Sequence, residues 1–158
     1  MSDIRVTFRF VQNVSDVDVL RTLFTEYANA LGVDLSFQGF SEELLLLPGP
    51  YAPPAGCAIL AFVDLEPAGC VALRRIDRQT CEMKRLFVRD DYRGLGIGRS
   101  LIERIIAQAR VLHYRLMRLD TLPSMRKAQM LYESFGFYDI EPYVYNPIQG
   151  ARFLETEL

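Results

Sequence analysis

A strand, a helix and a second strand follow one another in the middle of this chain, and this order constrains the fold more than any other feature. The pattern predicts a strand from Thr80 to Val88. From Gly96 to His113 the apolar residues recur at the spacing of an amphipathic helix, and Leu116 to Thr121 forms the next strand. A helical crossover within one sheet makes the flanking strands parallel. At least one parallel pair is therefore expected.

The first third of the chain is expected to contain one strand and two helices. Ile4 to Val11 alternates polar and apolar residues and predicts a strand. A helix then starts at an N-cap, Ser15, and ends near Gly32. A short helix covers Glu42 to Leu47, and the proline-rich segment from Pro48 to Pro54 is expected to be a rigid loop without regular structure.

Three strands, among them the one from Thr80 to Val88, are expected to form an antiparallel meander. They run from Cys57 to Asp64, from Gly69 to Ile76 and from Thr80 to Val88. The segment Glu66-Pro67-Ala68-Gly69 has the composition of a turn, as has Asp77-Arg78-Gln79.

The end of the chain adds a helix and two strands. Ser124 is the expected N-cap of this helix, and Gly136 is placed to close it in the left-handed conformation. Strands follow from Phe137 to Val144 and from Ala151 to Glu157. The order βα(α)βββαβαββ predicts an α/β fold with a mixed, mostly antiparallel sheet of about seven strands and helices on both faces.

Length and composition exclude several classes of protein. The chain has 158 residues, half of them apolar, and a formal net charge of -2, so we predict one domain over residues 1–158. One histidine and no polybasic run argue against binding to nucleic acid. The longest apolar span, Cys57 to Val63, is far shorter than the roughly 20 residues of a membrane helix. No membrane partner is expected.

The three cysteines, Cys57, Cys70 and Cys81, form no CxxC pair. A zinc site or a disulfide framework is therefore not expected, and the thiols should be small buried groups in a reducing compartment. These observations predict a cytoplasmic protein without a metal.

The segment Arg93-Gly94-Leu95-Gly96-Ile97-Gly98-Arg99-Ser100 carries the strongest chemical signal. A strand leads into a turn with three alternating glycines and then directly into a helix. Unpaired backbone N–H groups converge at such a helix start, where the helix dipole is positive, and they form a cradle for an anion such as phosphate. The alternative is an ordinary glycine-rich turn. The spacing fits neither a Walker A loop, which needs GxxxxGK[ST], nor the GxGxxG of a dinucleotide-binding fold.

Arg93-Gly94-Leu95-Gly96-Ile97-Gly98 resembles the Arg/Gln-x-x-Gly-x-Gly/Ala signature of the GNAT superfamily of N-acetyltransferases. The segment from Ala128 to Phe137 is similar to the A-x-x-L-Y-x-x-x-G-F motif of the same family. The resemblance implies an enzyme that uses acetyl-CoA as acetyl donor and needs no metal. It implies that residues 93–100 hold the pyrophosphate and that Leu86, Phe87 and Val88 lie along the pantetheine arm, where one N–H polarises the thioester carbonyl.

The resemblance also suggests two catalytic residues. Glu82 matches a position from which some family members present a glutamate as general base. The alternative is that Glu82 pairs with Lys84 or Arg85, or faces solvent. Tyr132 matches the tyrosine that points at the cofactor sulfur in many members; the alternative is a core aromatic residue. Met125 stands where many members have an asparagine that contacts the cofactor.

The acceptor is expected to be a small molecule or amino acid with a primary amine. Candidate walls of its site are Tyr27, the segment from Leu31 to Phe40, the loop from Pro48 to Pro54, and the segment from Pro142 to Pro147. Asp120 is expected either to bind substrate or to cap the next segment. A non-catalytic acyl-CoA-binding module, acetylation of a protein amine, and a homodimer remain open.

Overall fold

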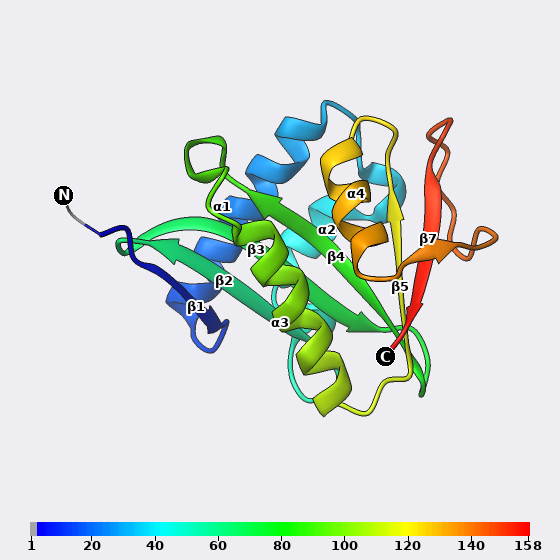
Figure 1. Ribbon diagram of the computed structural model, residues 1–158, viewed down its shortest axis with the longest axis horizontal. Coiled ribbons are helices and arrows are strands. Elements are labelled where there is room, and N and C mark those ends of the chain that lie inside the picture. Colours follow the sequence, from blue (N-terminus) through cyan, green and yellow to red (C-terminus); the bar gives the residue numbers. More distant parts are fainter. Residues whose placement is uncertain (1–2) are drawn as a thin grey trace.

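One sheet of seven strands organises residues 3–158, the part of the chain that this computed structural model describes (Figure 1). The spatial order is β1-β2-β3-β4-β5-β7-β6. Only β4 and β5 pair in parallel, so the predicted mixed and mostly antiparallel sheet is confirmed for the described residues. The strands are β1 (Val6–Phe10), β2 (Cys57–Val63), β3 (Glu66–Arg75), β4 (Thr80–Val88), β5 (Leu116–Thr121), β6 (Tyr138–Asp139) and β7 (Arg152–Glu157).

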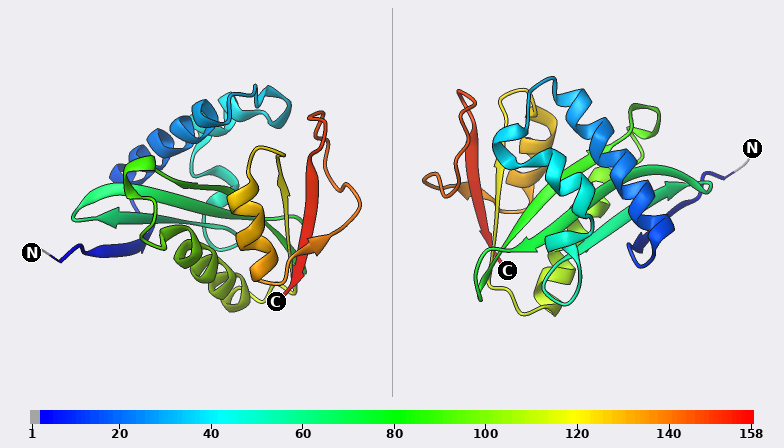
Figure 2. Two further views of the ribbon diagram at one scale, coloured as in Figure 1. Left: turned by 45° about the horizontal axis from the view of Figure 1, so that its top comes forward. Right: turned by 180° about the vertical axis from the view of Figure 1, so that it is seen from behind.

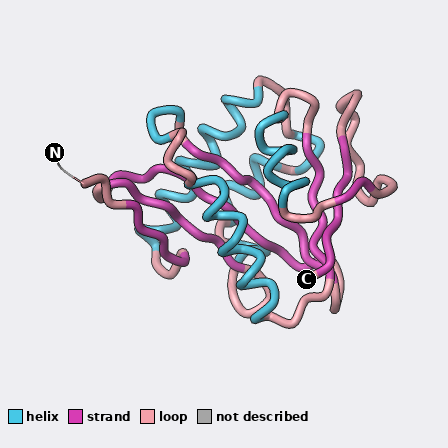
Figure 3. Tube along the Cα trace, viewed as in Figure 1, coloured by secondary structure: helices cyan, strands magenta, loops and turns pink. Residues whose placement is uncertain are grey.

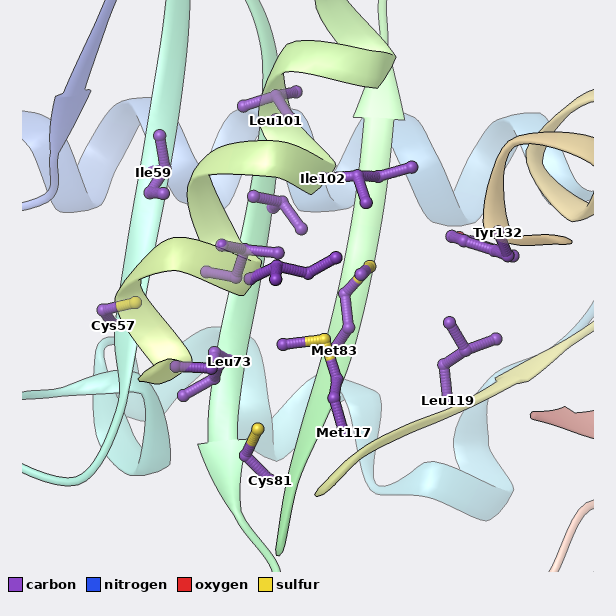
Figure 4. Close-up of a cluster of buried hydrophobic side chains, with 14 of the residues drawn as sticks. Cys57, Ile59, Leu73, Cys81, Met83, Leu101, Ile102, Met117, Leu119 and Tyr132 are labelled. Carbon is purple, nitrogen blue, oxygen red and sulfur yellow. The ribbon is translucent and has the colours of Figure 1, made fainter. Parts of the chain in front are cut away.

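Helices cover both faces of the sheet, as predicted. Two helices, α1 (Val14–Leu31) and α2 (Phe40–Leu46), lie on one face, and α3 (Ile97–Val111) and α4 (Arg126–Ser134) lie on the other (Figure 2). The apolar stripe of α3, which includes Leu101 and Ile102, packs on the centre of the sheet in one cluster with Leu73 and Met83 (Figure 4). Each face therefore has its own core cluster.

The first helix begins earlier than predicted. Asn13, not Ser15, is the N-cap, and its Oδ1 accepts a hydrogen bond of 2.8 Å from the N–H of Asp16. Asp16 is buried and its carboxylate also pairs with Arg9, which fixes the start of the helix. Gly32 ends α1 in the left-handed conformation, with φ of 67°, as expected.

The start of α4 also differs from the prediction. Met125 is the N-cap residue, without a side-chain hydrogen bond, and Ser124 lies one position before it. Gly136 follows the helix with φ of 91°, in the left-handed region as expected.

Two predicted loops were wrong. The hairpin between β2 and β3 turns at Asp64 and Leu65, whose φ values of 49° and 78° are those of a tight two-residue turn, and β3 already begins at Glu66. A bulge in the β2–β3 register between Ala61 and Phe62 accommodates this early start. The proline-rich segment contains a 3₁₀ helix, Gly49–Tyr51, because the buried Tyr51 anchors it to the core.

The chain between α4 and β7 holds less strand than predicted. Instead of a strand from Phe137 to Val144, only β6 pairs with β7. Pro142 and Pro147 lack the N–H groups of a ladder, and the segment runs as an irregular loop (Figure 3). The three free cysteines are buried, as expected. Among residues 3–158 no helix is long and apolar enough to cross a membrane.

Candidate active site

The parallel strands β4 and β5 stay paired over only a short distance. Their register joins Thr80 with Leu116, Cys81 with Met117 and Glu82 with Arg118, and no β4–β5 pair follows among the described residues. Beyond this point the two strands separate (Figure 1). The carboxyl-terminal half of β4 therefore has one open edge in the middle of the sheet.

A bulge distorts β4 at the place where it parts from β5. The register with β3 shifts between Cys70 and Ala72, and Arg85 adopts a left-handed φ of 61°. A non-glycine residue in this region is strained, and such strain is concentrated at functional sites. Lys84 lies on the α1–α2 face by the strand's alternation, and the bulge places Arg85 on the same face, while Leu86 packs on the opposite core.

The glycine turn leads from β4 into α3 as predicted. Gly94 and Gly96 have φ of 83° and 75°, conformations that favour glycine. The Arg93 N–H donates to the Asp90 carbonyl, and the Ser100 N–H donates to the Gly96 carbonyl. Within residues 3–158, no backbone N–H between these two donates to another residue. This run of free donors at the start of a 15-residue helix fits an anion.

The two arginines of the turn have partners within the chain. Arg93 lies 3.1 Å from Asp90 in an exposed ion pair, and the Arg99 guanidinium stacks 5.3 Å from the centre of the Phe135 ring. Gly98 faces Leu131 and Val88, where an added Cβ would make only ordinary contacts. Free backbone donors rather than free guanidinium groups therefore characterise this turn.

A cavity lies where β4 and β5 part. Its volume in this structure is about 30 Å³, and it is partly open to solvent. Tyr27 of α1 and Gln38 of a short 3₁₀ helix, Ser36–Gln38, line it on one side of the sheet, and Tyr132 of α4 lines it on the other. Met83 and Leu86 of β4 lie between them. Residues from both faces of the sheet thus line the cavity at the gap between the strands.

Tyr132 lies at the wall of this cavity. Its side chain points from α4 toward β4 and lies near Leu119 (Figure 4). Burial raises the pKa of its hydroxyl well above the ordinary value, so the group is a phenol at any physiological pH. A buried phenol in an apolar wall can donate one hydrogen bond into the cavity.

Glu82 is fully enclosed. Its side chain is 1% exposed, and it does not line the cavity. The Arg74 Nε donates to one carboxylate oxygen at 2.7 Å, and the Tyr143 hydroxyl donates to the other at 2.6 Å. The suggested pairing with Lys84 or Arg85 is not observed, because other side chains surround the carboxylate.

Three charged residues line the cavity itself. Arg85 is held by Glu43 through two hydrogen bonds of 3.0 and 3.1 Å. Asp120, on β5, accepts a hydrogen bond of 3.0 Å from Asn146. Lys84 is buried, and burial lowers its pKa.

Sequence reasoning considered Lys84 only as a partner for Glu82. Its signal was the run Thr80, Glu82 and Lys84, three polar side chains on one face of a central strand.

The predicted acceptor segments do not all reach the cavity. Tyr27, Leu31, Leu35 and Gln38 line it, as does Asn146 from the irregular loop before β7. Residues 48–54 do not line it, since that segment packs against the α1–α2 core instead. Met125, which replaces the family asparagine, forms part of the cavity wall.

No group of three or more potential metal ligands is found among residues 3–158.

Several known proteins resemble this chain. An N-acetyltransferase of Schizosaccharomyces pombe, named as uncharacterized, is 38% identical over 160 residues, which cover 100% of this chain and 98% of that protein. N-acetylaspartate synthetase of Danio rerio is 36% identical over 89 residues, which cover 55% of this chain and 32% of that protein.

Solved structures share the fold. An acetyltransferase from Streptococcus agalactiae has a TM-score of 0.80 and 23% identity, covering 97% of this chain and 98% of that one. A GNAT family acetyltransferase from Elizabethkingia anophelis with acetyl-CoA bound has a TM-score of 0.64 and 23% identity, covering 100% of both chains. Residues 20–137 match the Acetyltransferase (GNAT) family. The chain therefore belongs to the GNAT family and is an N-acetyltransferase.

Proposed function

We propose that this enzyme transfers an acetyl group from acetyl-CoA to the primary amine of a small molecule. The observation that carries the proposal is the cavity at the gap between β4 and β5, which has an open strand edge and a buried phenol on its walls. Side chains of several elements surround this cavity, which suits a small acceptor better than a protein chain. The resemblance to N-acetylaspartate synthetase, a name that denotes a small acetylated product, supports the same choice.

The donor half of the site fits acetyl-CoA. The free N–H groups between Arg93 and Ser100 would hold the diphosphate, and the open edge of β4 at residues 86–88 would hold the pantetheine arm. Bound acetyl-CoA supplies a thioester whose carbonyl carbon is open to attack by an amine. A backbone N–H of the bulged strand is suited to stabilise the negative charge that develops on the carbonyl oxygen.

The reaction requires that the acceptor ammonium loses a proton before attack, because an alkyl amine stays protonated up to about pH 10. The amine nitrogen then forms a bond with the carbonyl carbon, and the carbon–sulfur bond breaks with its electron pair on sulfur. The nitrogen gives up a second proton and the thiolate gains one. Tyr132 would donate a hydrogen bond to this thiolate, since its raised pKa opposes complete transfer of the phenolic proton.

Two carboxylates can receive the ammonium proton. Glu82 is the base suggested by the family resemblance, and the Tyr143 hydroxyl donates a hydrogen bond to it. Asp120 lines the cavity directly. We propose that Glu82 acts through a relay that includes water, while Asp120 holds the ammonium.

The test is a screen of small amines and amino acids for acetyl-CoA-dependent thiol release, with product identified by mass spectrometry. Glu82→Gln should lower kcat about 100-fold. Asp120→Asn should mainly raise KM for the amine. Unchanged turnover in Glu82→Gln would remove its role as base. Binding of acetyl-CoA without any product would favour the non-catalytic module, and modification of protein amines alone would contradict a small acceptor.

Three earlier predictions extend this proposal. Residues 1–158 would act as one domain, supported by a single sheet that includes residues 6 to 157. The enzyme would work in the cytoplasm, supported by three free thiols in the described chain. A homodimer remains a prediction that gel filtration with light scattering would check.

A further inference from the structure

Lys84 differs from the other cations around the cavity. It is 8% exposed, and none of the ion pairs found among residues 3–158 includes it. Its ammonium donates one hydrogen bond, 3.4 Å long, to the Gln38 side-chain oxygen. That oxygen also accepts a shorter bond of 2.7 Å from Arg85. A buried ammonium with a single long and shared hydrogen bond is poorly satisfied.

Neighbouring charges do not compensate Lys84 directly. Arg85 donates hydrogen bonds to both carboxylate oxygens of Glu43. The two carboxylate oxygens of Glu82 accept hydrogen bonds from Arg74 and Tyr143. The ordinary solution for a buried cation is a carboxylate within hydrogen-bonding distance, and the protein provides this to both arginines. Lys84 and Gln38 both line the cavity, so a molecule that enters can reach this corner of the site.

The same cavity contains a group of opposite charge. Asp120 lines the cavity from β5, and its carboxylate accepts a hydrogen bond from the neutral amide of Asn146. Apolar side chains, among them Leu31, Leu35 and Leu122, complete the walls. An anionic corner and a cationic corner in one partly apolar cavity suit a ligand that carries both charges.

We propose that the acceptor is an amino acid, and that Lys84 binds its carboxylate while the amine to be acetylated lies toward Asp120. This inference rests on the proposed function and narrows its substrate class. Lys84 is a specificity-determining residue in this view and takes no proton from the acceptor. A bound carboxylate would give the buried ammonium the ionic partner that the chain does not provide.

The experiment compares amino acids with the amines that lack only the carboxylate. The standard L-amino acids and their decarboxylated counterparts are assayed as pairs with the full chain and acetyl-CoA. We expect kcat/KM for the preferred amino acid to exceed that of its matched amine by about 10- to 100-fold, the usual range for a charged hydrogen bond. Lys84→Met should lose most of this preference, mainly through a higher KM for the amino acid.

Two controls keep the result interpretable. Lys127→Met removes an exposed lysine of α4 and should retain the preference. Lys84→Arg keeps a cation and should retain part of it. The affinity for acetyl-CoA and the melting temperature show whether each variant is folded.

The possible failures are distinguishable. If amines without a carboxylate are acetylated as well as the amino acids, or if Lys84→Met keeps the preference, the inference is wrong and the proposed function stands. If no compound of either set is acetylated although acetyl-CoA binds, the proposed function fails and this inference fails with it.

Discussion

The proposed donor end and the proposed acceptor end of the site are built in different ways. At the donor end, which lies outside the cavity, one continuous segment from Arg93 to Ser100 offers backbone N–H groups, and the side chains contribute little. At the acceptor end, side chains from α1, β4, β5 and the loop before β7 converge. Backbone recognition suits a donor that is the same throughout a family, whereas side chains can change from one member to another. The difference explains why the family was easier to identify than the acceptor.

The largest expected effect lies between the two ends, at Tyr132. Replacement by phenylalanine removes the hydroxyl that would stabilise the leaving thiolate, and kcat should fall about 100-fold while KM changes little. Tyr51→Phe is the matched control, because the Tyr51 hydroxyl is also buried and has no hydrogen-bond partner in the described chain. The comparison uses steady-state kinetics. Equal activity of the two variants would reduce Tyr132 to a core aromatic residue.

The next prediction compares two glycine substitutions, to separate a loss of acetyl-CoA binding from a loss of stability caused by backbone strain. Gly96 and Gly32 both have left-handed φ values and nothing within 4 Å of an added Cβ. Substitution of either glycine by valine should destabilise the fold by about 1–2 kcal/mol through strain alone. Only Gly96→Val should raise KM for acetyl-CoA, about tenfold, because it displaces N–H donors to a charged ligand. Urea unfolding and donor kinetics measure the two effects, and similar donor KM values in both variants would contradict an anion cradle.

The smallest expected effect is the contribution of Lys84 to the pH dependence of stability in the absence of ligand. Burial lowers the folded-state pKa of Lys84. The positive charges of Arg85 and Arg74 lower this pKa further, whereas the negative charges of Glu82 and Asp120 raise it. Between this lowered pKa and the ordinary value near 10.4, the unfolded chain holds a proton that the folded chain lacks. The free energy of unfolding should therefore rise with pH across this window relative to Lys84→Met, whose stability has no such dependence.

Urea unfolding at a series of pH values up to about 10 measures this slope. Lys127→Met serves as the exposed control and should follow the wild-type curve. A parallel curve for Lys84→Met would mean that Lys84 is solvated in the folded protein.

The features that were predicted correctly from the sequence are those that local residue patterns determine. The crossover from β4 through α3 to β5 was confirmed because apolar periodicity marks each element, and Gly32 and Gly136 were identified because left-handed helix ends favour glycine. The N-cap at Asn13 was missed because Ser15 offers similar chemistry two residues later. The turn at Asp64 and Leu65 was missed because no glycine marks it.

Contacts between distant residues could not be predicted. Glu82 is enclosed by Arg74 from the neighbouring strand and by Tyr143, which lies 61 positions away in the sequence. Lys84 lacks an ionic partner because Glu43 binds Arg85, which the bulge places beside it, and Lys84 shares the Gln38 oxygen with Arg85. The charge of a cavity assembled from separate elements is set by tertiary structure, and so it could not be predicted from the sequence.

The reactivity of the three buried cysteines can be used to measure how often the central strands of the sheet separate. Burial raises the pKa of Cys57 and of Cys81 to about 12, so neither is a thiolate at neutral pH. Cys57 and Cys70 lie in the adjacent strands β2 and β3, and Cys81 lies in β4. A maleimide can therefore label them only in molecules whose central strands have separated, and the labelling rate would count those events without any engineered probe.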